Sequence, residues 1–79
     1  MTECVVEITI HWRPPDMVIW LVQSDDDLRS TVADREQATV FANPDAAIAA
    51  AETFLVEEAA EWERDDRACP NITYQIVRW

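Results

Sequence analysis

One long segment of this chain has helical periodicity, so the segments on either side of it must supply the rest of the fold. Asn43 is a favoured N-cap residue, and the proline that follows it fits the first helical position. Asp45 then lies near the positive end of the helix dipole. Apolar residues recur on one face, with Phe54 at its margin: Ile48, Ala51, Leu55, Ala59 and Trp62. The pattern predicts a helix that ends before Pro70 and packs this face against a sheet.

The flanking segments have the patterns of β-strands. Residues 3–13 alternate between apolar and polar side chains, which predicts a strand with one buried face and one wet face. Residues 14–16, Pro-Pro-Asp, predict a turn. Residues 17–23 are apolar in both registers, as expected of a central strand that is at least partly covered on both sides. Residues 72–76 alternate again and predict a last strand after the helix.

The segment between the second strand and the helix allows two interpretations. Ser24, with Asp27 three positions later, resembles a helix capping box, so a short helix within residues 25–36 is one alternative. The β-branched and polar residues that follow favour the other, in which a turn leads into a hairpin or one bent strand over residues 28–42. The whole chain, residues 1–79, is then a single α+β domain. We expect two layers, with a mainly antiparallel sheet of four to five strands and one long helix packed across a face.

The composition excludes several classes of function. The chain has no glycine, which rules out the phosphate-binding loops of nucleotide-binding enzymes. Sixteen acidic residues against six arginines, with no lysine, give a formal net charge of −10 at pH 7. This charge is repelled by the phosphates of nucleic acids and by anionic membranes, so we expect direct binding to neither.

Candidate catalytic and metal-binding residues are few. His11 would need a nucleophile or an acid within hydrogen-bond reach, in a concave site, to take part in catalysis. The run Asp25, Asp26 and Asp27 lacks the alternating ligands, the glycine and the distal glutamate of a calcium loop. A working carboxylate pair on the helix would need one buried member with a raised pKa, which an exposed helix flank disfavours. We therefore expect no enzymatic activity, no cofactor and no metal.

The lengths of the apolar segments predict where in the cell the protein is found. Charged residues interrupt the N-terminal segment before it reaches the length of a signal peptide, and no run approaches the ~20 apolar residues of a membrane span. We expect a cytoplasmic protein in which Cys4 and Cys69 are reduced thiols. A disulfide between the two is the alternative, because their spacing carries no signature.

The most acidic stretch is EEAAEWERDD, residues 57–66, which carries a net charge of −5. As a helix it spans about 15 Å, a length over which one nucleic-acid strand presents about four or five phosphates. We predict that acidic side chains form a partner-binding surface, comprising Asp25, Asp26, Asp27, Glu52, Glu57, Glu58, Glu61, Asp65 and Asp66. Affinity would also require an apolar anchor, which Trp20, Phe54 or Trp79 could supply if exposed.

The chain resembles the small acidic anti-CRISPR proteins of bacteriophages and mobile elements, in particular those directed at type I systems. The resemblance rests on a length near eighty, the strand, strand, helix, strand order, the helix NPDAAIAAAETFLVEEAAEWE, and the clusters SDDD and EWERDD. It implies a non-enzymatic inhibitor, acting in a bacterial host, that binds the basic DNA-recognition surface of a surveillance complex and imitates the charge of DNA. For type I-C the receptor would be the Cas subunit that reads the protospacer-adjacent motif.

Two other interpretations stay open. Residues 38–55, a strand that leads into the helix, suit an antitoxin-like or other small protein-interaction module equally well. The acidity and the missing lysine also suit an ordinary domain of a halophile, because surface charge bears on solubility and association rather than on fold. The sequence allows both a monomer and a homodimer.

Overall fold

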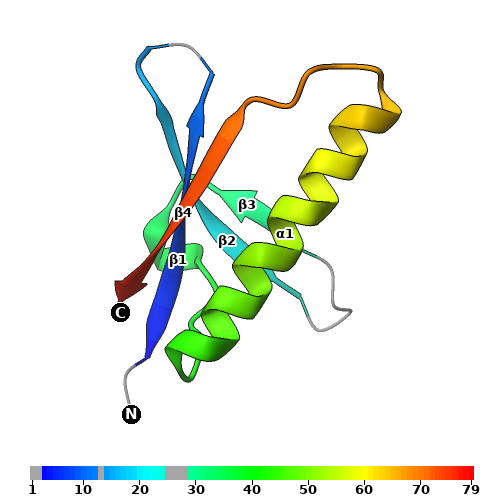
Figure 1. The fold of residues 1–79 in the computed structure, drawn as a ribbon. Helices are drawn as coiled ribbons and strands as arrows, with labels where there is room; N and C mark the ends of the chain where they lie inside the picture. The colour runs from blue at the N-terminus through cyan, green and yellow to red at the C-terminus, as the bar shows by residue number, and fades with distance from the viewer. Residues whose placement is uncertain (1–2, 13, 25–28) are drawn as a thin grey trace.

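The computed structural model describes residues 3–12, 14–24 and 29–79. Along the chain the elements are β1 (Cys4–His11), β2 (Met17–Gln23), β3 (Arg29–Val32), the 3-10 turn η1 (Arg35–Gln37), α1 (Pro44–Arg64) and β4 (Asn71–Arg78). The strands of this described part form one four-stranded antiparallel sheet in the order β3-β2-β1-β4. Helix α1 runs obliquely across one face of this sheet (Figure 1). The predicted two-layer α+β fold is confirmed.

The register of β1 explains the alternation of its side chains. Ile8 lies opposite Ile19 of β2 and Tyr74 of β4, and these residues belong to the layer against α1. Glu7 lies opposite Trp20, on the other face. Strand β2 lies between β3 and β1, which agrees with the central position predicted from its two apolar registers.

Helix α1 begins where the sequence predicts. The Asn43 side-chain oxygen accepts a hydrogen bond from the backbone N–H of Ala46 at 2.9 Å, which satisfies one of the free donors of the first turn. At the other end the α-helix stops at Arg64, six residues before Pro70. The cap and the proline together predicted both ends.

The buried face of α1 is rotated from the predicted one. Its buried residues are Ala47, Ala50, Ala51 and Phe54. Ile48 is 36% exposed and Ala59 is exposed, so neither belongs to the buried stripe, whereas Phe54, placed at the margin, is 4% exposed. Alanines lie on every face of the first half of α1, so the faces differ little in the apolar area that they could bury. Turning the Phe54 ring inward therefore gives the largest gain in buried apolar area, because an aromatic side chain buries about 150–250 Å².

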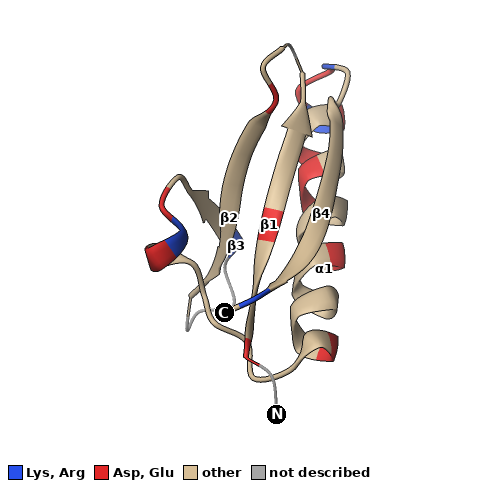
Figure 2. Ribbon diagram, turned by 90° about the vertical axis from the view of Figure 1, so that its left-hand side faces the viewer, with Lys and Arg blue, Asp and Glu red and all other residues tan. Residues whose placement is uncertain are grey.

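The other face of the sheet is covered at one end by η1, which lies on the opposite side of the sheet from α1 (Figure 2). The guanidinium carbon of Arg35 lies 5.6 Å from the ring centroids of both Trp20 and Trp79. Its Nη2 also donates a hydrogen bond to the Arg78 carbonyl at 2.7 Å. Arg35 thereby fixes the end of the chain against β2.

The segment before α1 returns between β1 and β2. The backbone N–H of Thr39 donates to the Leu21 carbonyl at 3.1 Å, and Phe41 exchanges two backbone hydrogen bonds with Cys4. The strand character expected of residues 28–42 is therefore correct in part, but the expected hairpin or bent strand within that range is not formed, because β3 pairs with β2 while Thr39 and Phe41 pair with Leu21 and Cys4. Strand β3 forms a hairpin with β2, η1 adds a short helical turn, and Thr39 and Phe41 pair as strand residues do. Residues 25–28, where the turn was expected, lie outside the described residues.

Both cysteine thiols are free, with Cys4 buried and Cys69 exposed. Within the part of the chain that the structure describes, no helix is both long enough and apolar enough to cross a membrane.

Candidate functional site

The exposed part of α1 and of the turn that follows it is acidic along its length. Residues 44–66 are all described, and their exposed carboxylates are those of Asp45, Glu52, Glu57, Glu61, Glu63, Asp65 and Asp66. Figure 2 shows acidic positions distributed from the first turn of α1 to its end. We call these seven side chains the acidic helix surface. At about 1.5 Å per residue it is about 33 Å long.

Glu57 belongs to this surface but is held by a cation. Both of its carboxylate oxygens accept hydrogen bonds from the Arg29 guanidinium, Oε2 at 3.1 Å from Nη2. This hydrogen bonding is the main cause that lowers the pKa of Glu57 below its ordinary value. The pair joins the β3 edge to α1, and the positive charge of Arg29 offsets the negative charge that Glu57 contributes to the predicted partner surface.

Glu58 is only half exposed, unlike its neighbours, and lies beside the core. Partial burial raises its pKa, the nearby charge of Glu61 raises it further, and a hydrogen bond from Trp62 acts in the opposite direction. The expectation that a single helix flank would leave all three of Glu57, Glu58 and Glu61 in solvent is therefore wrong for Glu58. Its carboxylate has the perturbed pKa that the sequence argument required of a buried member of a pair.

Two further residues predicted to bind the partner, Asp65 and Asp66, lie at the end of α1. Asp65 is the C-cap, and Asp66 has a φ of 56°, the left-handed conformation that glycine usually supplies at this position. The N–H of Asp66 donates to the Glu63 carbonyl and that of Arg67 to the Trp62 carbonyl, both at 3.0 Å. This turn brings the Arg67 guanidinium to 4.5 Å from the Trp62 ring centroid.

The remaining residues of the predicted partner surface are not all described by the structure. Glu52 is exposed on the outer side of α1, as expected. Asp25, Asp26 and Asp27 lie outside the described residues. Among the residues that are described, no group of three or more histidine, cysteine, aspartate or glutamate side chains is arranged to hold a metal ion.

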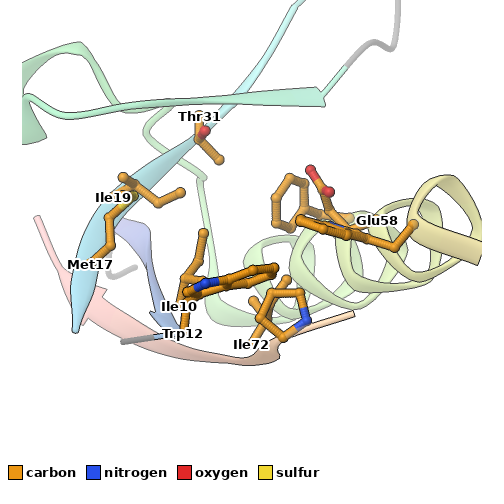
Figure 3. A pocket seen from close by; sticks show the side chains of 10 residues that line it. Ile10, Trp12, Met17, Ile19, Thr31, Glu58 and Ile72 are labelled. Carbon is orange, nitrogen blue, oxygen red and sulfur yellow. The ribbon is translucent and has the colours of Figure 1, made fainter. Parts of the chain in front are cut away.

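An apolar hollow lies between the C-terminal half of α1 and the β1–β2 end of the sheet (Figure 3). Its volume is about 260 Å³, and its walls come from β1, β2, β3, α1 and the start of β4. The Trp12 and Trp62 rings meet at its edge, with centroids 5.2 Å apart and planes inclined by 36°. Trp12 and Met17 are 47% and 58% exposed, so the rim of the hollow is open to solvent. Glu58 is the carboxylate in its wall, and Thr31 adds a hydroxyl from β3.

This hollow was not predicted from the sequence, although the sequence contains one signal of it. Phe54, Glu58 and Trp62 are spaced four residues apart, so they occupy one row on the helix. A carboxylate between two aromatic residues in such a row indicates an acid that faces the core. The contribution of Trp12 and Met17 depends on how the β1–β2 turn packs against α1, which sequence spacing does not reveal.

His11 has the partners that a catalytic role would require, but not the setting. Its Nδ1 lies 3.0 Å from an Asp16 carboxylate oxygen and its Nε2 lies 3.0 Å from the Thr73 hydroxyl. All three residues are exposed. His11 also alternates with Ile10 and Trp12, which line the hollow on the helix side. The hydrogen-bonded row therefore lies on the opposite face of the sheet from the hollow, where the three residues join the β1–β2 turn to β4.

Comparison of the chain with models of protein families, with curated proteins and with solved structures finds no match.

Proposed function

We propose that this protein is an acidic, non-enzymatic inhibitor that binds the basic nucleic-acid-binding surface of a partner protein and excludes the nucleic acid. The observation that carries the proposal is the acidic helix surface, with five exposed carboxylates along α1 and two more in the turn that follows it. A rigid helix presents these charges without first having to order them, which lowers the entropic cost of binding.

The arrangement of the arginines supports this proposal. Arg29 is paired with Glu57, Arg35 contacts the Trp20 and Trp79 rings, and Arg67 lies over Trp62. Each of these cations is directed at a neighbour within the molecule, while most carboxylates of the acidic helix surface point to solvent. Arg64 is exposed in the last turn of α1, but the exposed carboxylates outnumber it. The potential outside α1 is therefore negative, and such a field attracts a basic groove and speeds association with it.

The charge density limits what this surface can do by itself. Over about 33 Å a single nucleic-acid strand presents on the order of ten phosphates, against seven carboxylates here, one of them paired. The acidic helix surface thus supplies approach and orientation, while tight binding requires an apolar contact as well. Phe54 is in the core and Trp20 is half-buried under Arg35. Trp79 is exposed but contacts Arg35 of η1, on the opposite side of the sheet from α1, so none of the three anchors considered from the sequence lies within the acidic helix surface.

Following the resemblance to anti-CRISPR proteins, the partner in this proposal is the DNA-reading subunit of a type I surveillance complex, with type I-C as the first subtype to test. The experiment measures how much target double-stranded DNA a purified complex retains as the protein is added. We expect displacement near stoichiometric protein, weakening as salt rises from ~0.05 to ~0.5 M because exposed charges are then screened.

The decisive variant replaces Glu52, Glu61 and Glu63 by glutamine. A matched control replaces Glu3, Glu7 and Glu36 by glutamine, which removes the same charge from outside α1. We expect at least tenfold weaker inhibition from the first variant and less than a threefold change from the control, with unfolding midpoints close to that of the parent chain. Equal inhibition by both variants, or no displacement of DNA by the parent chain, would refute the proposal.

A further inference from the structure

The hollow beside α1 has dimensions that suit one side chain. Its volume of about 260 Å³ lies just below the ~300–1,000 Å³ of pockets that take drug-sized ligands. The exposed Trp12 and Met17 at its rim leave it accessible from solvent. The walls are apolar apart from Glu58 and Thr31 (Figure 3). An occupant should therefore carry an apolar or flat body and a small number of polar atoms.

The charges around Glu58 favour a positively charged occupant. Glu61 and Glu57, on the same helix, are the charges that act on Glu58, and both repel it. Arg29 of β3 is bound to Glu57, and Arg67, after the helix, lies over the Trp62 ring. The Trp62 N–H is the hydrogen-bond donor that acts on Glu58. A carboxylate that is half-buried between like charges would gain from a cation brought close to it.

The aromatic walls select the type of cation. Trp12 and Trp62 line the hollow, and indole faces attract cations. The Arg67 guanidinium already lies 4.5 Å from the Trp62 ring centroid and Trp12 packs against the same ring, so the ring open to an added cation is that of Trp12, which is 47% exposed. A guanidinium stacks on aromatic rings and binds a carboxylate through two hydrogen bonds, whereas an ammonium is a more strongly hydrated point charge. The molecule already uses both contacts, in Arg35 on Trp20 and Trp79 and in Arg29 on Glu57.

We propose that the hollow receives one arginine side chain of the basic partner, with its guanidinium on the Glu58 carboxylate and its plane against the exposed indole ring of Trp12. This assignment rests on the proposed function for the source of the arginine. Surfaces that bind nucleic acid are rich in arginine and lysine. The hollow lies beside the acidic helix surface, so one partner can engage both, and the arginine supplies the desolvated central contact that the exposed carboxylates lack.

The test uses N-acetyl-arginine methylamide as a probe of the intact protein, followed by tryptophan fluorescence and by the indole N–H resonances of Trp12 and Trp62. We expect saturable binding with a dissociation constant on the order of 1 mM, as is usual for a fragment of this size. The matched uncharged probe, N-acetyl-citrulline methylamide, should bind at least tenfold more weakly, and the lysine analogue severalfold more weakly. Equal binding of the arginine and citrulline probes overturns the proposal.

Two variants locate the binding. Glu58→Gln removes the charge at the wall of the hollow and should weaken binding of the arginine probe at least tenfold, whereas Glu36→Gln, on the opposite side of the sheet from α1, should change that binding less than threefold. Trp12→Leu keeps an apolar wall and should weaken binding severalfold, because the aromatic face is lost. Urea unfolding of each variant checks that the fold is kept. A Glu58→Gln protein that binds the probe like the parent chain overturns the assignment.

The same variants separate this inference from the proposed function. If the arginine probe depends on Glu58 but the protein displaces no DNA from the surveillance complex, the proposed partner is wrong and the arginine site stands. If DNA is displaced and Glu58→Gln inhibits as well as the parent chain, the arginine site is wrong and the proposed function stands.

Discussion

Glu57 and Glu58 are adjacent in the sequence and have opposite environments. The helix turns about 100° per residue, which directs Glu57 toward Arg29 on β3 and Glu58 toward the apolar hollow. The Arg29 hydrogen bonds lower the pKa of Glu57, and partial burial raises that of Glu58. Two carboxylates that look equivalent in EEAAEWERDD therefore have different physical roles.

The raised pKa of Glu58 makes folding stability depend on pH. The folded chain holds the Glu58 proton more tightly than the unfolded chain does, so this residue contributes stability below its unfolded pKa. That contribution is lost as pH rises through the raised pKa of the folded state. Near neutral pH the ionised Glu58 carboxylate is therefore unfavourable. We expect Glu58→Gln to increase the free energy of unfolding there, by up to about 0.5 kcal/mol, and by less near pH ~3.

Urea unfolding of the Glu58→Gln protein and its parent at the two pH values measures this difference. Glu52→Gln is the matched control, because Glu52 is exposed on the outer side of the same helix. It should change stability little, and by a similar amount at both pH values. A Glu58→Gln protein that is less stable than its parent near neutral pH would show that the Glu58 carboxylate makes a favourable contact instead.

At the scale of the elements, local signals and tertiary packing contribute differently. The cap at Asn43, the alternation in residues 3–13 and the apolar run in residues 17–23 predicted the helix start and two strands correctly. The rotation of α1 was not predictable, because its alanines provide no strongly preferred face and the sheet decides which row is buried. The hollow escaped prediction for a related reason, since Trp12 and Glu58 meet only through the tertiary fold.

The rotation of α1 gives a direct comparison between the predicted and the observed core. Phe54→Ala should cost about 3–5 kcal/mol, because it removes a buried ring and leaves a cavity. Ile48→Ala should cost about 1 kcal/mol or less, since Ile48 is 36% exposed. Small domains have only about 5–15 kcal/mol of stability, so the first change should shift the urea midpoint strongly. Equal losses for the two variants would favour the stripe predicted from the sequence.

At the scale of the whole molecule, the net charge of −10 is spread over a small body. The molecule measures 41 × 29 × 18 Å, and the Debye length is about 30 Å at 0.01 M salt but about 8 Å at 0.15 M. In dilute salt most carboxylates therefore repel one another across the molecule, whereas at physiological salt only near neighbours do. Against this repulsion stand the continuous apolar core between α1 and the sheet and the paired or stacked arginines.

This balance predicts how stability responds to sodium chloride, and it separates an ordinary acidic protein from a halophilic one. We expect the chain to be folded at ~0.01 M salt and to gain stability modestly up to ~0.15 M, where screening is largely complete, and little beyond. The Glu52, Glu61 and Glu63 to glutamine variant carries less charge and should show a smaller gain. Urea unfolding at ~0.01, ~0.15 and ~2 M salt measures both proteins. A parent chain that is unfolded in dilute salt and keeps gaining stability up to ~2 M would favour the halophile interpretation, because adaptation to a salty cytoplasm would then explain the acidity without a basic partner.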